Sequence, residues 1–446
     1  MTMSELSGIR NIILVKTLCF CRHFSLSPSN NHIFSCKILI IGGGSGGITM
    51  AAKFARREKN KDSVIVLEPN KKHYYQPFFT LIGAGIVKLK KAVRLEKQVM
   101  PRGVIWIQDY ARHINPNCCY VDTKQGHTVN YQYLIVAVGL IMNYNRTPGM
   151  LESLDDPNSS VSTIYSENYC EKTFSDLKRF QGGEALFLFP KCPVKCPGAP
   201  LKMAFLADSF FTKMNRRSKA NITYITGGKC LFGVKKYADQ LDKVVLRKNL
   251  NVEFNIILKE INHERKEAVF YHGGQPECTV TRRYDLLHVV PYQRPPDVIY
   301  RNKEINDRHG FLDVSKYTLQ HNKFPNIYGI GDCTSTPNSK TAAAIAKQSY
   351  VVEHNLLATM NNRFPTQKYN GYGACPLLTS YNTVILAEFI YDNIPFETMP
   401  FDQSQESVIA YYMKRHLFPF LYWHAMLKGR YHGPGVIRKI VNPFGW

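Results

Sequence analysis

The hydrophobic positions near the start of the chain fall into short runs separated by a glycine-rich turn and a segment of helical spacing. Cys36–Ile41 (CKILII) is a continuous apolar run, which is typical of a strand buried on both faces. Ile48–Arg57 (ITMAAKFARR) is compatible with a helix, and Ser63–Leu67 (SVIVL) is a second apolar run. The order strand, helix, strand predicts a βαβ unit and therefore a parallel sheet.

The same pattern returns in the middle of the chain. Glu184–Phe189 (EALFLF) predicts a strand, Pro200–Phe211 a helix and Asn221–Thr226 (NITYIT) a second strand. The 446 residues leave room for more than one domain. We therefore expect an α/β fold with tandem Rossmann-like dinucleotide-binding domains.

The turn after the first predicted strand carries a dinucleotide fingerprint. In Gly42–Gly47 (GGGSGG), Gly42, Gly44 and Gly47 occupy the glycine positions of G-x-G-x-x-G. These glycines allow a tight turn, a close approach of the pyrophosphate, and packing of helix on strand, and the phosphates then face the helix N-terminus. Glu68 ends the second strand about twenty residues later, where a carboxylate accepts hydrogens from ribose hydroxyls. A dinucleotide site is therefore expected here.

Two later motifs favour FAD over NAD. Asn326–Asp332 (NIYGIGD) and Tyr131–Gly139 (YQYLIVAVG) resemble the FAD-side motifs of flavoproteins with two dinucleotide-binding domains. In Tyr131–Gly139, Gln132 and Val138 replace the usual Asp and Thr, so this match is looser. The resemblance implies that Asp332 hydrogen-bonds the ribityl chain of FAD. It also implies an FAD domain that is split by an inserted domain.

The corresponding turn of the inserted unit lacks phosphate-binding chemistry. Pro190–Pro200 (PKCPVKCPGAP) contains one glycine and four prolines, which have no N–H to offer a phosphate. The second strand of this unit ends at Thr226 without a ribose-binding acid. NADH is therefore a poor candidate for the electron donor. Cys196 occupies the turn instead, and Lys195 together with a helix N-terminus near Leu201 should favour its thiolate.

The net charge and the spacing of the cysteines indicate which kinds of partner and ligand the protein can be expected to bind. The net charge is +23 at pH 7 and the pI is near 9.4. Without a DNA- or RNA-reading motif, this charge predicts an anionic membrane surface and a small anion rather than nucleic acid. The cysteines include no CxxC pair, and the closest spacings, Cys118–Cys119 and Cys192 with Cys196, lack zinc-like partners. We therefore expect no metal site.

The two ends of the chain differ from the rest. Residues 1–35 are basic, poor in acids and contain serines, which predicts a mitochondrial transit peptide; a disordered extension is the alternative. No stretch of 18 apolar residues exists, so no transmembrane helix is expected. Residues 408–446 interleave aromatic and basic side chains and contain Pro419 and Pro434, which predicts a broken pair of amphipathic helices in the membrane interface. The alternative is a helical pair that closes onto the core or onto the partner subunit of a homodimer.

Further stretches are long and unusual enough to indicate a family. They are Tyr75–Phe78 with Leu81–Gly85 (YQPF…LIGAG), Pro193–Pro200 (PVKCPGAP), Ser218–Asn221 (SKAN), Phe232–Ala238 (FGVKKYA), Leu319–His321 (LQH), Gly329–Cys333 (GIGDC), Ser339–Ala344 (SKTAAA), Gly371–Leu377 (GYGACPL) and Ile385–Phe389 (ILAEF). In these stretches the chain resembles the mitochondrial (animal) branch of the sulfide:quinone oxidoreductase family. The resemblance covers nearly all of residues 36–440.

The resemblance implies that Cys196 and Cys375 face each other across the flavin, although they lie far apart in the sequence. The position of Cys196 in the turn also indicates that this cysteine is reactive, whereas the reactivity of Cys375 is implied by the resemblance alone. Pro197 departs from the small residue expected there, and it has no amide to hydrogen-bond a sulfur anion. The cofactor contacts expected from the motifs and the resemblance are Gly42, Gly44, Ser45, Gly46, Gly47, Glu68, Gln76, Ala111, Gly331, Asp332, Lys340, Thr341, Ala342 and Ala343.

The implied activity is FAD-dependent oxidation of hydrogen sulfide at the mitochondrial inner membrane, on which the protein is peripheral. Hydrosulfide opens a Cys196–Cys375 disulfide, leaving a persulfide on Cys375 and a Cys196 thiolate that reacts with the flavin. Two electrons pass through FAD to ubiquinone, and glutathione or sulfite takes the sulfane sulfur. Two alternatives remain, an NADH:quinone oxidoreductase of the same fold and a catalytically inactive flavin-binding membrane protein.

The expected domain boundaries follow from these motifs. The FAD-binding domain comprises residues 36–154 and 291–375, and the second Rossmann-like domain is inserted at 155–290. Residues 1–35 form the leader, and residues 376–446 form the C-terminal membrane-associating region.

Overall fold

The computed structural model describes residues 32–58, 63–191 and 193–441. Its first main sheet has the strand order β5-β2-β1-β8-β7-β6, and β19 also pairs with β8. Strands β1, β2, β8 and β19 are parallel. The bounds in this sheet are β1 Ile33–Ile41, β2 Val64–Leu67, β5 Ile105–Ile107, β6 Ala111–Asn115, β7 Tyr120–Thr123, β8 Thr128–Val136 and β19 Ile327–Gly329.

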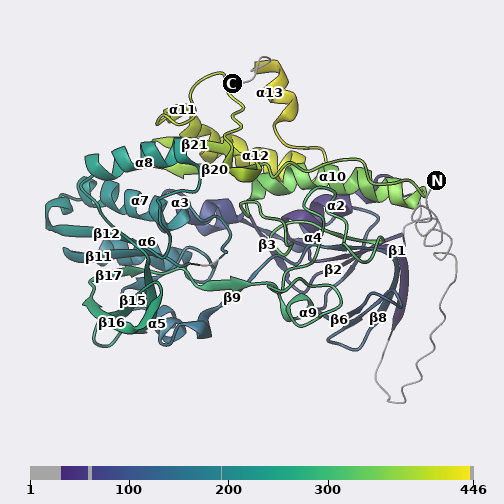
Figure 1. Ribbon diagram of the computed structural model, residues 1–446, viewed down its shortest axis with the longest axis horizontal. Helices are drawn as coiled ribbons and strands as arrows, with labels where there is room; N and C mark the ends of the chain where they lie inside the picture. Colours follow the sequence, from purple (N-terminus) through teal and green to yellow (C-terminus); the bar gives the residue numbers. More distant parts are fainter. Residues whose placement is uncertain (1–31, 59–62, 192, 442–446) are drawn as a thin grey trace, which may run out of the picture.

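The second main sheet has the order β10-β17-β11-β12-β13, with all neighbouring strands parallel. A smaller antiparallel sheet, β14-β15-β16, accompanies it. The two main sheets lie toward opposite ends of the long axis in Figure 1. The bounds are β10 Val161–Ser162, β11 Gly183–Phe189, β12 Ala220–Thr226, β13 Asn251–Phe254, β14 Ile256–Asn262, β15 Glu267–His272, β16 Gln275–Arg283 and β17 Leu286–His288.

Two short antiparallel strands, β9 (Ile141–Asn143) and β18 (Tyr292–Arg294), connect these halves. The chain passes into the second half after β9 and returns through β18. The first half is therefore assembled from segments on both sides of the second half. This is the α/β flavoprotein arrangement expected from the order of the sequence motifs.

The helices place the functional segments. Helix α2 (Ser45–Ala55) follows β1 and packs beside α10 (Ala342–Met360), while α7 (Ala199–Lys213) covers the second sheet. A hairpin of β20 (Gly373–Leu378) and β21 (Val384–Phe389) packs against α7 and α10. The remaining elements are β3 Lys72–Tyr74, β4 Val93–Leu95, η3 Gln76–Phe78, α3 Phe79–Gly83, η4 Leu89–Lys91, α4 Glu96–Val99, η5 Tyr144–Arg146, α5 Met150–Asp155, α6 Cys170–Arg179, η6 Arg217–Lys219, α8 Lys235–Arg247, α9 Asp297–Tyr300 and η7 Tyr391–Asn393.

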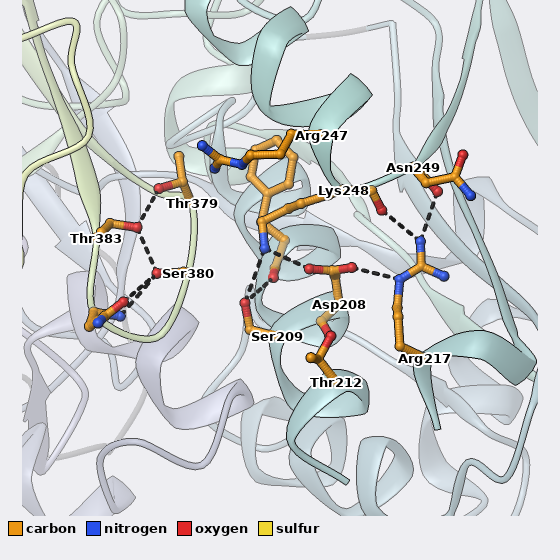
Figure 2. Close-up of polar contacts among 12 residues, drawn as sticks. Asp208, Ser209, Thr212, Arg217, Arg247, Lys248, Asn249, Thr379, Ser380 and Thr383 are labelled. Atoms are coloured by element: carbon orange, nitrogen blue, oxygen red, sulfur yellow. Dashed lines mark hydrogen bonds and ion pairs between the residues drawn. The ribbon is translucent and has the colours of Figure 1, made fainter. Parts of the chain in front are cut away.

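Polar contacts fix the hairpin against the second half. Asp208 on α7 pairs with Lys248 just beyond α8, with the two charged atoms 2.6 Å apart (Figure 2). The neighbouring Arg247 pairs with Glu406 at 2.6 Å, and Glu406 also accepts a hydrogen bond from Thr383 in the hairpin turn. These contacts therefore fix the position of the β20–β21 hairpin relative to α7 and α8.

The C-terminal segment is a continuous helix from residue 408 to residue 426. It consists of α11 (Val408–Tyr412), the π turn η8 (Met413–Leu417), α12 (Phe418–Leu421) and the π turn η9 (Tyr422–Met426). The sequence prediction that Pro419 breaks this segment was wrong. The wide turn before Pro419 relieves the clash that proline makes with the preceding helical turn, so the helix continues.

A separate helix, α13 (Gly435–Val441), follows Pro434, as the sequence predicted. In the part of the chain that the structure describes, no helix is long and apolar enough to cross a membrane. In Figure 1 the C-terminal elements (yellow) lie over the hairpin and α10.

The predicted elements are present with small shifts at their ends. Strand β1 begins at Ile33, inside the segment expected to be a leader, because Ile33 pairs with Thr128 on β8. Helix α7 begins at Ala199 rather than near Leu201. The rest of the expected leader, residues 1–31, lies outside the described residues, as do Cys192 and residues 442–446.

Candidate active site

The carboxyl ends of the parallel strands in the first sheet meet at one edge. Ile41 at the end of β1 is in register with Leu67 of β2 and with Val136 of β8, and Val136 is in register with Gly329 of β19. The residues that follow these strand ends are therefore neighbours in space. They include the glycine turn 42–47, Glu68 and the Gly331–Asp332 pair that the sequence predicted.

The glycine turn has the geometry of a dinucleotide-binding loop. Gly42 has a φ of +99°, and a Cβ on Gly47 would lie 1.7 Å from the carbonyl oxygen of Gly42. A Cβ on Gly44 would meet open space, so this side of the turn is accessible to a ligand. The Gly43 amide donates to Oε2 of Glu68 at 2.6 Å. The turn therefore presents a tight packing side, an open side and a carboxylate.

A second group of expected residues faces the same edge from β19 and α10. The Gly331 amide donates to Oε1 of Gln348 at 2.9 Å, and the buried Nε2 of Gln348 makes no hydrogen bond of ordinary geometry to any residue that the structure describes. Burial raises the pKa of the Asp332 carboxyl, although the nearby Lys340 and Lys195 ammonium groups oppose this shift. A buried donor without a partner beside a buried acid fits a polar cofactor at this edge.

The remaining expected contacts lie on other elements. Thr341 caps α10, and Ala342 and Ala343 form its first turn. Gln76 is exposed at the start of η3, and Ala111 begins β6. Thus the glycine turn, Glu68 and Gly331–Asp332 share one strand edge, while Gln76 and Ala111 approach from separate elements.

The two predicted reactive cysteines come together from different halves of the sequence. Cys196 lies in the loop between β11 and α7, and its amide donates to the carbonyl of Lys340 at 3.0 Å. Cys375 is buried in β20. The Cys375 thiol donates a hydrogen bond to the Cys196 sulfur, which holds the pKa of Cys196 well below its usual range and that of Cys375 well above. Cys196 is therefore the thiolate of the pair.

Two buried lysines, neither of which the sequence had indicated, face the thiolate. The Lys202 ammonium lies 3.3 Å from the Cys196 sulfur and, after Cys375, contributes to lowering the cysteine pKa. Lys414, in η8, also lowers this pKa. Burial lowers the pKa of Lys414 itself to about 7, assisted by the charge of Lys202. Lys202 lies within the apolar run Pro200–Phe205 (PLKMAF), which was the available signal for this residue. Lys414 is followed by Arg415 and His416 and has the sequence context of an ordinary basic cluster.

The residues after Cys196 explain how the sulfurs approach. A Cβ on Gly198 would lie 2.7 Å from Cδ2 of Leu377 and 3.2 Å from the Cys375 sulfur, so a larger residue would force the strand away. Pro197 instead lines a cavity of about 270 Å³ beside the loop, together with Pro193 and Lys340. The contact between the cysteine loop and Cys375 therefore depends on Gly198.

The described residues that follow β11 and β12 in the second half pack closely against each other. A Cβ on Gly227, which follows β12, would lie 2.7 Å from the backbone nitrogen and from Cβ of Lys191. The Gly227 amide donates to the carbonyl of Phe189 at the end of β11. Protein atoms therefore occupy the space next to Gly227. Among the residues described, no group of His, Cys, Asp and Glu could hold a metal ion.

The family model for the pyridine nucleotide-disulphide oxidoreductases matches residues 36–178. The mitochondrial sulfide:quinone oxidoreductase of Mus musculus is 44% identical over 406 residues, covering 91% of this chain and 89% of its own. That of Dictyostelium discoideum is 40% identical, covering 90% of this chain and 88% of its own. The solved sulfide:quinone oxidoreductase of Aquifex aeolicus has a TM-score of 0.76 at 18% identity, with coverage of 92% and 95%, and supports the fold.

The similarity to the mouse and Dictyostelium proteins extends over nearly the whole length of this chain and of both relatives. The chain therefore belongs to the sulfide:quinone oxidoreductase family.

Proposed function

We propose that this protein oxidises hydrogen sulfide with FAD and passes two electrons to ubiquinone. The observation that carries the proposal is the pair Cys196–Cys375, in which one sulfur is a stabilised thiolate and two buried lysines face it. Family membership supports sulfide and a quinone as the substrates.

FAD is the flavin that suits the strand edge. Glu68 would hold the adenine-side ribose, the amides at the start of α2 would meet the pyrophosphate, and Asp332 would hold the ribityl chain. The open side of Gly44 and the unpartnered Nε2 of Gln348 support a bound polar cofactor. When bound, FAD supplies the two-electron redox chemistry that amino-acid side chains lack.

The chain's own residues direct the sulfur chemistry. In the oxidised state, hydrosulfide attacks the sulfur of Cys375 in a Cys196–Cys375 disulfide. The disulfide bond breaks, a new sulfur–sulfur bond forms on Cys375, and Cys196 leaves as a thiolate. This direction is favoured because the thiol with the lower pKa is the better leaving group. The ammonium of Lys202 stabilises the departing thiolate and attracts the anionic substrate.

The acceptor of the sulfane sulfur is a small thiol such as glutathione, or sulfite. The cavity beside Pro197 supports access for such a molecule, because it adjoins the cysteine loop and is lined in part by Lys340 and Asn393. The alternative electron donor NADH has less support, since Lys191 fills the space beside Gly227.

The C-terminal segment associates with the membrane surface without crossing it. Its apolar side chains point outward at Ile409, Tyr412 and Phe420, which are 65%, 57% and 60% exposed. In α13, Val436 and Ile440 are 72% and 73% exposed. An exposed apolar row with neighbouring basic residues suits the interface of an anionic bilayer.

The relatives are named mitochondrial, which supports a mitochondrial location; the basic leader and the quinone substrate favour the inner membrane. The domain division extends this proposal, with residues 36–154 and 291–375 forming the FAD-binding domain. Residues 155–290 then form the inserted domain, and residues 376–446 the membrane-associating region.

Sulfide-dependent bleaching of the flavin absorbance tests the function. Sulfide without quinone should reduce the flavin of the wild-type protein, whereas Cys196→Ser and Cys375→Ser should each abolish the reduction. Cys278→Ser, which removes an exposed cysteine, is the matched control. Reduction by NADH but not by sulfide would overturn the proposal.

A further inference from the structure

A buried polar chain connects the C-terminal segment to the glycine turn. The Tyr422 hydroxyl lies 2.7 Å from Oγ of Ser45 and 2.6 Å from Nε2 of His73. On the other side of the ring, Nδ1 of His73 lies 3.1 Å from the carbonyl oxygen of Gly43 and 3.3 Å from Oε2 of Glu96. His73, Glu96 and Tyr422 are buried. This series of polar contacts therefore ends on Ser45 and Gly43, two residues of the glycine turn.

The hydrogen-bond directions in this chain follow from its acceptors. Nδ1 of His73 faces a carbonyl oxygen and a carboxylate, so this nitrogen carries the hydrogen. In the neutral imidazole, Nε2 is then the acceptor, and the Tyr422 hydroxyl donates to it. The Tyr422 oxygen in turn accepts from the Ser45 hydroxyl. Tyr422 therefore fixes the orientation of the side chain at the first residue of α2.

The local backbone of the C-terminal segment directs Tyr422 inward. Tyr422 is the first residue of the π turn η9, and π turns within helices often occur at functional sites. Its ring lies 4.6 Å from the Tyr75 ring and 5.0 Å from the Trp423 ring, measured between ring centroids. Packing thus holds the ring, while the hydroxyl makes the polar contacts.

The same segment also contacts the other end of α2. Arg56 donates to the carbonyl oxygens of Lys428 and Gly429, the latter at 2.8 Å. Lys53 lies 2.9 Å from Nδ1 of His432. A Cβ on Gly429 would lie 2.9 Å from side-chain atoms of both Lys53 and Arg56, so this glycine allows the close approach. Residues 422–432 therefore follow α2 from its first residue to its C-cap.

This arrangement matters because α2 is the helix whose N-terminus would meet the FAD pyrophosphate. Ser45 is only half-buried on the open side of the turn, beside the exposed Gly44. Loss of the Tyr422 contact would leave the Ser45 hydroxyl free to rotate and the buried Nε2 of His73 without its donor. An unpaired buried polar group weakens the state that contains it.

We propose that Tyr422 is a cofactor-positioning residue, through which FAD binding at the glycine turn and docking of the C-terminal segment on α2 stabilise each other. The inference rests on the proposed function in one respect, the identity of the cofactor as FAD. It adds a structural link between the cofactor and the segment proposed to bind the membrane. Because binding linkage is reciprocal, each event strengthens the other by the same factor.

The first test measures FAD affinity by flavin fluorescence in the full-length, detergent-solubilised protein after removal and re-addition of FAD. Tyr422→Phe keeps the packed ring and removes the hydroxyl. We expect its dissociation constant for FAD to rise roughly tenfold. The matched control is Tyr237→Phe, which removes another buried hydroxyl, bonded to the carbonyl of Glu388 and the carboxylate of Glu397. This control should bind FAD as the wild type does.

A double-mutant cycle with Ser45→Ala tests whether Tyr422 acts through Ser45. The double variant should lose less FAD affinity than the product of the two single losses, because both changes remove the shared Tyr422–Ser45 hydrogen bond. Multiplicative losses would contradict the inference, as would unchanged affinity in Tyr422→Phe. A wild-type protein that binds no FAD would overturn the cofactor assignment and this inference together, so the two failures are distinguishable.

Trypsin cleavage after the exposed Lys428 and Arg430 reports docking of the segment. FAD should slow cleavage at these sites in the wild type and in Tyr237→Phe. In Tyr422→Phe this protection should fall by the same factor as the FAD affinity. Equal protection by FAD in Tyr422→Phe and wild type would contradict the coupling.

Discussion

Nζ of Lys202, near the start of α7, lies 3.3 Å from Sγ of Cys196, in the loop that leads into this helix. The lysine is buried, so its ammonium has little water to replace the sulfur as a partner. The charge of the Cys196 thiolate raises the pKa of Lys202 against the effect of burial. Lys202 and Cys196 therefore stabilise each other as an ammonium–thiolate pair.

Replacing Lys202 should make the Cys196 thiol harder to deprotonate. A charge-assisted hydrogen bond contributes about 1.5–3 kcal/mol, which corresponds to a rise of about one to two pH units in the Cys196 pKa for Lys202→Gln. The pH dependence of iodoacetamide alkylation of the reduced protein measures this shift, with Cys196→Ser to identify the reacting sulfur. Lys243→Gln, at an exposed position on α8, is the control. An unchanged alkylation profile in Lys202→Gln would exclude the pair.

Lys414 should make the stability of the protein depend on pH. Its pKa is lowered to about 7, so between about pH 7 and its ordinary value the unfolded chain binds a proton that the folded chain has released. Stability should therefore rise with pH through this window. Lys414→Met should remove that component and have the higher unfolding temperature at pH 7, by a few °C.

Differential scanning fluorimetry at about pH 7 and pH 9 compares the two proteins directly. Other groups also titrate in this window, so the informative quantity is the difference between wild type and Lys414→Met. Lys243→Met should follow the wild type. A difference that does not change with pH would show that Lys414 holds its proton throughout.

Gly198→Ala should separate the reactive sulfurs without unfolding the protein. The added Cβ would lie 2.7 Å from Leu377 and 3.2 Å from the Cys375 sulfur, so β20 has to shift. We expect slower re-formation of the Cys196–Cys375 disulfide and at least a roughly tenfold loss of sulfide oxidation, because a misplacement of about 1 Å can cost that much or more. Gly435→Ala, where a Cβ meets open space, is the control for activity.

Acidic residues in the exposed apolar row should release the protein from membranes. The double variant Ile409→Glu/Phe420→Glu should lose at least roughly tenfold in affinity for vesicles that contain anionic phospholipid, since burial of one large apolar side chain contributes about 1.5–3 kcal/mol. Vesicle flotation measures the bound fraction. Leu246→Glu alters an equally exposed apolar residue on α8 and should bind normally. Normal vesicle binding by the double variant would show that the membrane contact lies elsewhere on the protein.

The dinucleotide edge could be predicted because its chemistry is local. Gly42–Gly47 and Glu68 follow their strands directly, and parallel pairing then brings the strand ends together. Cys196 was indicated for the same reason, since it occupies the turn after β11. Cys375 lies in a hairpin strand, and the sequence around it carries no chemical signal apart from family resemblance.

Lys414 and the C-terminal contacts could not be predicted from local pattern. Lys414 reaches the cysteines because a π turn rotates it inward, and the spacing of residues in an ordinary α-helix does not anticipate that rotation. The same applies to Tyr422 and Ser45, which lie on elements far apart in the sequence. Pro419 misled the prediction of a helix break because its effect depends on the width of the preceding turn.

The two π turns also set how the C-terminal helix tolerates changes in length. Each wide turn accommodates an extra residue relative to the α-helix, and one residue corresponds to about 100° of rotation. Deleting one residue within η8 would therefore convert it to an α turn and leave the later side chains facing nearly as before. Deleting one residue from the α-helical turn α12 would instead swing every later side chain by about 100°, so Tyr422 would leave Ser45. Single-residue changes in the length of this helix are therefore expected to be tolerated at the two π turns and rejected between them.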